Sequence, residues 1–407
     1  MRRGYLSEYF EGVAMKRLSA VEADSTRSNQ HEYNATRDML TFMGRPSTST
    51  RLPARFIYID DDSNDPIIED AFLTLYDSRE NQPHRSAEYR FYFPTTTVSQ
   101  NTNEGDVLVI AKRRDEGLLV IVAASGSTAV SQLEWLFGFN EDSLPRFAVR
   151  TELDDERYNV GFAASVILES IGIDVSFSEE HSLEALLERF GGSFPKTADF
   201  SAYARESLHG IDPRDDPDAA LMTWIERETA LFYTLERYLI ERQLAEGFGS
   251  DQVEGFLKYS KSIQQRRRSR IGYALENHLE VVFTSLGIKY KRTAVTENKT
   301  KPDFLFPGQD EYHDATFDPL NLSILAVKST CKDRWRQVLA EADRIEDKHL
   351  LTLETAISAN QTAEMQAKRL QLVLPKSLHP TYTDEQQAWL FDIAEFSRMV
   401  LERQQRA

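Results

Sequence analysis

The first half of the chain is a series of short apolar segments separated by polar clusters. Five segments rich in β-branched and aromatic residues are typical of strands; they span 54–59, 70–77, 89–93, 106–112 and 117–124. Strands at this spacing predict a mostly-β barrel or sandwich. One helix is expected at 127–138, with Ser127 or Thr128 as its N-cap.

At the start of the second half of the chain, the apolar residues are spaced for helices rather than for strands. Apolar positions recur at helical spacing and predict three long helices, at 218–246, 251–264 and 268–286. Short apolar runs then predict four strands, at 289–295, 303–307, 322–328 and 370–375. Further helices are expected at 333–346 and 384–403. Strands that alternate with helices predict an α/β fold for this half.

An acidic stretch separates the two halves. Residues 151–220 contain sixteen acidic and five basic residues, a local net charge of −11. Loop-like sequences at 190–196 and 209–218 follow a short helix expected near 182–190. We therefore predict a multidomain chain, α/β plus mostly-β, with an N-terminal domain over 1–180, an acidic linker over 181–208 and an α/β domain over 209–407.

The charge of the whole chain is −17, which argues against a protein that coats nucleic acid generically. The charge is unevenly distributed, however. Residues 256–301 contain eleven basic and three acidic residues, a local net charge of +8, and include the run RRRSR at 266–270. This segment is either a solvated basic face or a phosphate-binding surface, and composition alone does not separate the two.

The cysteine count and the apolar runs exclude several classes of protein. Cys331 is the only cysteine, so an intramolecular disulfide and a multi-cysteine zinc site are both excluded. The N-terminal residues MRRGYLSEYFEG lack the apolar stretch of a signal peptide, and the longest apolar run, 118–124, is too short to cross a bilayer. We therefore expect a cytoplasmic protein without a membrane partner.

A candidate catalytic pattern lies in the second half. Pro302-Asp303 opens one expected strand and Lys328 ends the next, which is the skeleton of the PD-(D/E)xK nucleases. In such a site a carboxylate holds Mg²⁺, and a lysine offsets the charge that develops on the attacked phosphate. The pattern is short and also arises by chance. Ala326 stands where the second acid is usual, so Glu341, thirteen residues after Lys328, is the candidate second carboxylate.

A candidate base-reading motif follows Lys328. Lys332, Asp333 and Arg334 would lie at the start of the helix expected at 333–346. Lysine and arginine donate to guanine O6 and N7, and aspartate accepts from cytosine N4, so the triplet would suit adjacent C·G pairs in a major groove. The alternative is that Asp333 only caps the helix.

Longer runs of sequence resemble the EcoRII family of restriction endonucleases. The runs are RRRSRIG (266–272), LENHLEVVF (275–283), KPDFLFP (301–307), YHDATF (312–317), LAVKSTCKDRWRQVL (325–339) and EADRI (341–345). The resemblance is fainter in the first half, at KRLSA (16–20), YDSR (76–79), AEYR (87–90) and LEWLFG (133–138). It implies a type IIE enzyme with an N-terminal B-three-like β pseudobarrel and a C-terminal α/β PD-(D/E)xK domain, which dimerises around a CCWGG or CCNGG palindrome.

The resemblance also assigns roles to individual residues. The implied catalytic residues are Asp303, Lys328, Glu341, Glu276 and Tyr312, and the implied Mg²⁺ ligands are Asp303 and Glu341. The resemblance places Lys332, Asp333 and Arg334 on the triplet that reads the outer C·G pairs. Basic residues near the catalytic pattern are further candidate contacts to target DNA: Arg336, Arg266, Arg267, Arg268 and Arg270. A second, effector copy of the DNA would release a blocked catalytic cleft by binding to Lys16, Arg17, His31, Arg79, Arg85, Glu88 and Arg90.

The first half and the helix at 218–246 depart from the family. Tyr89 replaces a basic residue of an effector-loop segment, and TWIER (223–227) stands where the family has an arginine run linked to autoinhibition. A DNA-binding regulator without cleavage, or a methylation-directed or repair nuclease of the same fold, are the alternatives. For a restriction enzyme, a homodimer is expected, with a cognate cytosine methyltransferase as a functional rather than a bound partner.

Overall fold

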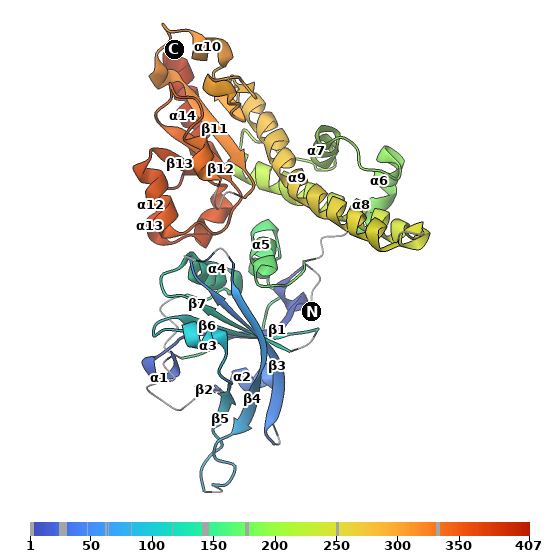
Figure 1. Cartoon of the computed structure of the whole chain (residues 1–407), viewed down its shortest axis with the longest axis vertical. Coiled ribbons are helices and arrows are strands. Elements are labelled where there is room, and N and C mark those ends of the chain that lie inside the picture. Colours follow the sequence, from blue (N-terminus) through green and yellow to red (C-terminus); the bar gives the residue numbers. More distant parts are fainter. Residues whose placement is uncertain are drawn as a thin grey trace. The chain divides into compact units, whose positions relative to one another are not determined.

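The computed structural model describes residues 4–23, 31–46, 48–61, 63, 65–82, 84–115, 117–140, 146–175, 179–249, 252–330 and 334–407. The chain folds into two compact units (Figure 1). Unit 1 is Met1–Asp174 with Thr355–Ala359 and Pro380–Thr383, and unit 2 is Val175–Glu354 with Asn360–His379 and Asp384–Ala407. Within the described ranges, no helix combines the length and the apolar character that crossing a bilayer requires.

Unit 1 is built on an eight-stranded mixed sheet. The strands are β1 (Phe10–Arg17), β2 (Glu32–Asn34), β3 (Thr50–Ile59), β4 (Ile67–Asp77), β5 (Tyr89–Tyr92), β6 (Val107–Arg113), β7 (Leu118–Ala123) and β8 (Ala148–Arg150). Their order is β2-β5-β4-β3-β7-β6-β1-β8, and only β3 and β7 pair in parallel. The five strands expected from the sequence are therefore β3 to β7. No strand pairing in the described part of the chain closes this sheet into a barrel.

Short helices accompany this sheet. They are α1 (Ala20–Ala23), α2 (Met39–Met43), α3 (Thr97–Asn101), α4 (Thr128–Phe137) and α5 (Phe162–Ser170), with 3-10 turns at Leu6–Glu8 and Glu156–Tyr158. The prediction of α4 is confirmed, with Ser127 at its N-cap and Gly138 in the left-handed region, φ +65°, at its end. Every residue of β7 is buried, so this strand is covered on both faces of the sheet.

Unit 2 is an α/β unit around a five-stranded sheet, as the alternation of elements predicted. The strands are β9 (Lys291–Arg292), β10 (Phe304–Phe306), β11 (Ser323–Lys328), β12 (Lys348–Thr352) and β13 (Leu370–Val373), in the order β13-β12-β11-β10-β9. β11, β12 and β13 are parallel, and β10 is antiparallel to both of its neighbours.

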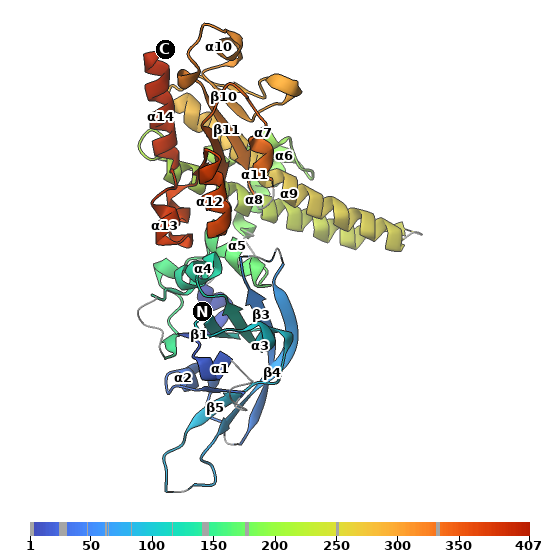
Figure 2. The ribbon, with the colours of Figure 1, turned by 60° about the vertical axis from the view of Figure 1, so that its left-hand side comes forward.

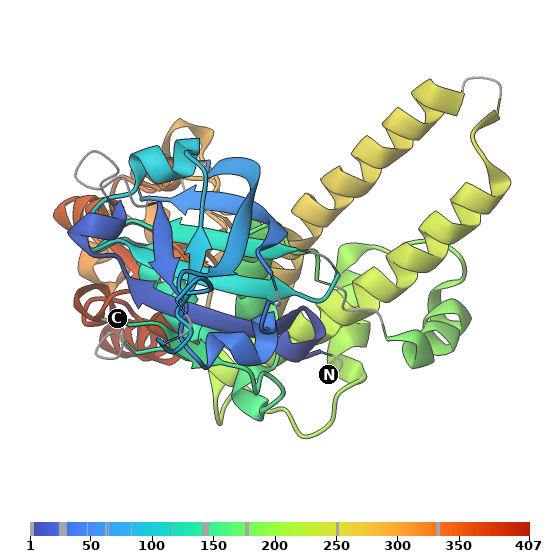
Figure 3. The same ribbon diagram turned by 90° about the horizontal axis from the view of Figure 1, so that it is seen from below.

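The helices of unit 2 are longer. They are α6 (Leu183–Phe190), α7 (Thr197–Glu206), α8 (Pro217–Glu246), α9 (Gln252–Ser285), α10 (Gln309–His313), α11 (Trp335–Val338), α12 (Ala359–Ala367), α13 (Asp384–Gln387) and α14 (Ile393–Arg406). Short 3-10 turns lie at Glu180–Ser182, Glu297–Lys299, Pro319–Asn321 and Lys376–Thr381. α8 and α9 run antiparallel as a hairpin (Figure 3), and α14 lies along unit 2 near the sheet (Figure 2).

Several elements differ from the sequence prediction. The helices expected at 251–264 and 268–286 are the single helix α9, because no proline interrupts the stretch between them. The helix expected at 384–403 is two helices, since Asp392 and Glu395 form a capping box that starts α14 afresh. The helix expected at 333–346 is only α11, which ends at Val338. β12 was not expected at all.

The acidic segment 181–208 is largely helical and packs within unit 2. α6 and α7 contribute Leu186, Phe200 and Ala204 to a buried cluster with Leu231 and Phe232 of α8. Such packing needs apolar positions at helical spacing, which α6 has despite its two acidic residues, Glu184 and Glu188. The segment therefore adds to the helical layer around α8 instead of forming an extended linker.

Candidate active site

The antiparallel register of β10 and β11 brings the catalytic pattern together. Phe304 pairs with Leu325, so Asp303, just before β10, lies beside the last residues of β11. The Asp303 Oδ2 atom accepts hydrogen bonds from the Val327 amide at 2.7 Å and from the Lys328 Nζ at 2.9 Å. Both side chains keep partial solvent access, 19% for Asp303 and 27% for Lys328. A carboxylate and an ammonium are thus paired at an accessible strand end.

Glu276 reaches this pair from α9. It accepts a hydrogen bond from Arg292 at 2.7 Å, and the same guanidinium binds Glu280 at 2.7 Å. Burial raises the pKa of Glu276, and the negative charge of Asp303 adds to that rise, although Arg292 opposes it. Asp303 and Glu276 are therefore close enough to repel each other electrostatically.

Glu341 completes the group from the turn after α11. Burial raises the pKa of Glu341; Asp303 raises it further, while Lys328 and Lys348 lower it. Its Oε2 atom is buried and has no hydrogen-bond partner among the described residues. A buried carboxylate oxygen without a donor is costly unless something positive binds to it. The sequence predicted Glu341 as a candidate, and in the structure its carboxyl lies within electrostatic range of Asp303 and Lys328.

The carboxylates of this site could hold a magnesium ion only if water or phosphate oxygens completed its coordination shell. In the described ranges, no three histidine, cysteine or acidic side chains close on one point as a protein-only metal cage would. Mg²⁺ commonly takes one or two carboxylates and completes its shell with water and phosphate oxygens. Asp303 and the unpartnered oxygen of Glu341 match that requirement.

Tyr312 lies in the hydrophobic core of unit 2 and not at the Asp303–Lys328 pair. It is fully buried in a cluster with Leu305 and Ile324. Its hydroxyl donates to Glu297, and burial followed by this hydrogen bond raises the pKa of Tyr312. Its contacts are those of a residue that supports the segment after Glu341.

The predicted target-DNA residues after β11 are only partly described. Lys332 and Asp333 lie outside the described residues. Arg334 occupies the N-cap position of α11 and is exposed. Arg336 is also exposed; it pairs with Glu364 at 2.6 Å and lies 4.5 Å from the Trp335 ring centroid.

The arginine run on α9 divides into different environments. Arg270 is only 8% exposed, lies 4.5 Å from the Phe232 ring centroid, and its pKa is lowered by burial. Arg267 binds the buried Glu236 at 2.7 Å, and Arg266 lies against the Phe194 ring. Arg268 is exposed to solvent. The helical spacing of α9 turns Arg270 toward α8, so it has the contacts of a core residue instead of those expected of a DNA ligand.

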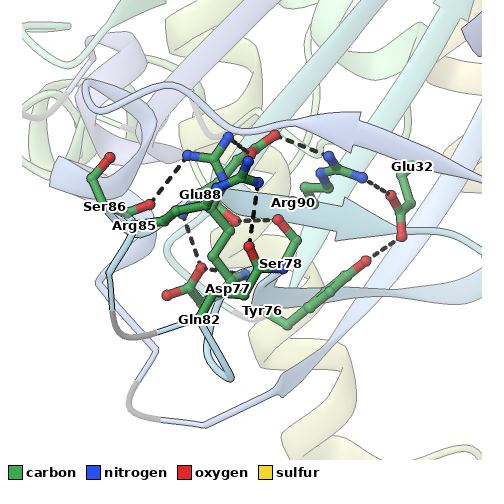
Figure 4. Close-up of polar contacts among 10 residues, drawn as sticks. Glu32, Tyr76, Asp77, Ser78, Gln82, Arg85, Ser86, Glu88 and Arg90 are labelled. Carbon is green, nitrogen blue, oxygen red and sulfur yellow. Dashed lines mark hydrogen bonds and ion pairs between the residues drawn. The ribbon is translucent and has the colours of Figure 1, made fainter.

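Part of the predicted effector set forms one polar cluster on β4, β5 and the loop between them (Figure 4). Arg90 donates to Glu32 at 2.8 Å and to Glu88 at 2.9 Å, and Arg79 also pairs with Glu88. Arg85 donates to Gln82 at 3.3 Å in the same loop. An arginine that is paired with a carboxylate can bind DNA instead when a phosphate or a base edge replaces the carboxylate as its hydrogen-bond acceptor.

Of the remaining predicted effector residues, His31 lies beside this cluster. It directly precedes Glu32 of β2, its carbonyl accepts a hydrogen bond from the Phe93 amide at 2.9 Å, and its ring packs edge-on against Phe93. Lys16 and Arg17 lie elsewhere in unit 1. Lys16 and Arg17 end β1, seventh in the strand order, whereas β5 is second. Lys16 is 8% exposed and its ammonium binds Glu22 at 2.6 Å, and Arg17 donates to the Gly105 carbonyl at 3.1 Å. Because Lys16 is buried and paired with Glu22, its ammonium stabilises unit 1 and is not exposed to bind a phosphate.

Sequence reasoning missed the residues that hold the acidic groups and turns of the candidate site in place. Arg292 binds Glu276, and Arg344 donates to the carbonyls of Tyr312, Asp314 and Phe317. Their partners are carbonyls and acids brought close by the fold, so no local motif marks them. The adjacent runs KYKR and EADRI carried only the general signal of charge near the motif.

Comparison with known proteins places the second half of the chain. Residues 232–397 match the family model described as EcoRII C terminal. The chain is 41% identical over 204 residues to the type II restriction enzyme EcoRII of Escherichia coli, which covers 50% of this chain and 50% of that enzyme. The chain thus matches about half the length of this curated relative.

Solved structures of similar shape are more distant. They include metal-depleted Ecl18kI in complex with uncleaved, modified DNA, with 15% identity, a TM-score of 0.44, and coverage of 56% of this chain and 85% of that one. The restriction endonuclease PspGI–substrate DNA complex has 16% identity, a TM-score of 0.44, and coverage of 53% and 95%. The chain is therefore similar to the EcoRII C-terminal family over residues 232–397, and to the enzyme EcoRII over half of its own length.

Proposed function

We propose that this chain is a Mg²⁺-dependent type II restriction endonuclease, which hydrolyses double-stranded DNA at a short palindrome of the CCWGG or CCNGG type. The proposal rests chiefly on the contact of 2.9 Å between Lys328 and Asp303. Glu341 and Glu276 lie within electrostatic range of that pair. All four residues fall inside the segment that matches the EcoRII C-terminal family.

Each residue of the group would have a distinct task. Asp303 and Glu341 would hold Mg²⁺, which when bound neutralises the attacked phosphate and lowers the pKa of a water. Lys328, held by Asp303, would offset the negative charge that develops on the phosphate oxygens. Glu276, held by Arg292, would add a third carboxylate beside them.

The DNA contacts and the assembly follow from the same proposal. Two subunits would each cut one strand, because a two-fold protein matches a two-fold site. Lys332, Asp333 and Arg334 would read base edges; of the three, the structure describes Arg334, at the N-cap of α11. Arg336 and Arg268 are exposed cations that can contact phosphates. The chain would act in the cytoplasm beside a cytosine methyltransferase that protects the host sites.

Unit 1 would carry an effector DNA copy as a B-three-like domain. Its support is a pair of arginines that share one carboxylate: Glu88 binds Arg90, both labelled in Figure 4, and also binds Arg79. Adding a short cognate duplex should accelerate cleavage of a plasmid with one site. Arg90→Ala should abolish that acceleration, whereas Arg55→Ala, at an exposed pair with Asp70, should preserve it. Equal acceleration in both variants would refute the effector site.

Sequencing the ends of digested plasmids tests the main proposal. Wild-type protein with Mg²⁺ should cut unmethylated plasmid at one short palindrome and leave cytosine-methylated plasmid intact. Binding without cleavage would identify a DNA-binding regulator. Cleavage confined to methylated DNA would identify a methylation-directed nuclease. Mass measurement in solution should give about twice the 46.7 kDa chain.

A further inference from the structure

Lys348, the first residue of β12, is a buried lysine outside the catalytic pattern. It is 7% exposed, and its Nζ donates to the carbonyl oxygens of Leu339, at 2.9 Å, and of Glu341. No ion pair within 4.0 Å is found for this ammonium in the described part of the chain. Burying an ammonium group costs free energy unless its N–H groups are hydrogen-bonded. Because Lys348 donates to two main-chain carbonyls of one turn, we infer that its role concerns the conformation of that turn.

That turn carries Glu341 and has an unusual backbone. α11 ends at Val338, and the Glu341 amide donates back to the Val338 carbonyl at 3.1 Å. Ala342, the next residue, is fully buried with φ +52°, a conformation that residues with a Cβ rarely adopt. Such a backbone persists only where the surroundings over-determine it. Lys348 supplies that constraint on the side before Ala342.

The chain after Glu341 is held from the opposite side. The Asp343 amide donates to Glu297 at 3.2 Å, and the Arg344 guanidinium donates to the Phe317 carbonyl at 3.0 Å. Glu341 is therefore fixed between two sets of contacts. The Glu341 carbonyl accepts from the Lys348 ammonium, whereas the Glu341 amide donates only to its own turn, at Val338.

We propose that Lys348 is a positioning residue that holds the backbone of Glu341, so that its carboxylate faces Asp303 and Lys328. The role rests on the proposed function, in which Glu341 is a metal ligand. Lys348 would touch neither DNA nor the ion. Residues that orient metal ligands typically change metal affinity or activity by about 10–100-fold when they are replaced.

The test is a titration of the full-length protein with Mn²⁺ alone, with the free ion followed by electron paramagnetic resonance. Lys348→Met should raise the Mn²⁺ midpoint by about 10–100-fold, because the turn loses both hydrogen bonds. Lys348→Gln keeps a donor but is too short for both carbonyls, and should raise the midpoint at least tenfold. Lys368→Met removes a half-exposed lysine of unit 2 and is the matched control, with an unchanged midpoint.

A second background separates positioning from a general loss of structure. In Glu341→Ala protein, adding Lys348→Met should change the Mn²⁺ midpoint by less than about twofold, because the two residues act through one group. Circular dichroism identifies any variant that is unfolded, and Lys348→Gln then decides the question.

The possible outcomes separate the positioning role from the proposed function. An unchanged midpoint in a folded Lys348→Met or Lys348→Gln protein overturns the positioning role. A full effect of Lys348→Met in the Glu341→Ala background overturns it as well. Wild-type protein that neither binds Mn²⁺ nor cuts DNA overturns the proposed function, whereas a Glu341-dependent site that ignores Lys348 overturns only this inference.

Discussion

His349 provides a test of how burial sets the stability of unit 2. Its imidazole is 3% exposed, its ring centroid lies 5.1 Å from that of Phe396, and its Nδ1 has no hydrogen-bond partner among the described residues. Burial lowers the pKa of His349 from 6.5 to about 3, and the charge of Arg403 adds to the effect. The imidazole therefore stays neutral in the folded chain at pH values where an unfolded chain protonates it.

The sign and the size of the effect follow from proton linkage. Because the folded-state pKa of His349 is lowered, the unfolded chain binds more protons between pH 6.5 and about 3, and stability falls as the pH falls through that window. At about 1.36 kcal/mol per pKa unit, acidification from about pH 7.5 to about pH 5 removes roughly 2 kcal/mol from the free energy of unfolding through this group.

His349→Leu removes the titrating group and keeps an apolar side chain. We expect urea unfolding of unit 2 to show that wild-type protein loses roughly 2 kcal/mol more than this variant between about pH 7.5 and about pH 5. Phe396→Leu is the matched control: it removes packing beside the imidazole but no titrating group, so its cost should be equal at both pH values. Equal pH dependence in the wild type and in His349→Leu would refute the reasoning.

Five further changes to the chain test three predictions. Asp218, 5% exposed, accepts hydrogen bonds from the amides of Lys376, Ile393 and Ala394, so Asp218→Ala should cost about 3 kcal/mol in calorimetric unfolding. Asp216→Ala, which removes only the N-cap of α8, should cost about 1 kcal/mol. Arg268→Ala should lower the slope of log K against log salt by about 0.9 without a change in melting temperature, whereas Arg270→Ala should lower that temperature. Removing residues 1–180 should leave an active nuclease free of effector control, and a truncated protein that still needs a second DNA copy would contradict this.

The pairing of Asp303 with Lys328 could be predicted from the sequence because it depends on local features. Two short apolar runs flank the motif, and antiparallel pairing of neighbouring strands brings the start of one to the end of the other. The sequence therefore predicts that the lysine and the carboxylate meet at neighbouring strand ends, as they do in the structure.

The surroundings of Glu341 could not be predicted, because they depend on distant contacts. Trp335, Val338, Ala342 and Ile345 have helical spacing and favoured a helix through Glu341. The structure buries all four, yet the chain leaves the helix after Val338 to reach β12. β12 itself is buried throughout, so it lacks the alternation of apolar and polar residues that marks a half-exposed strand.

The arginine run shows a different limit. Arg268 and Arg270 contribute equally to the positive charge of the segment. In the structure, however, Arg268 is exposed and Arg270 faces Phe232 on α8. The sequence prediction divided this stretch into two helices and did not assign Arg270 to a buried face. In the single helix α9, Arg270 lies on the same face as the buried Ala274. Charge counting therefore located the basic segment correctly and gave no information on which of its side chains are free to bind phosphate.

The central claim is that Asp303, Lys328 and Glu341 form a Mg²⁺-dependent centre that cuts DNA. Its most direct test is single-turnover cleavage of a CCWGG duplex in Mg²⁺, with excess effector duplex, by wild-type and Asp303→Ala protein. Binding of the same duplex in Ca²⁺ is measured alongside. The account predicts that Asp303→Ala binds like the wild type and does not cut. Cleavage by Asp303→Ala at the wild-type rate would contradict it.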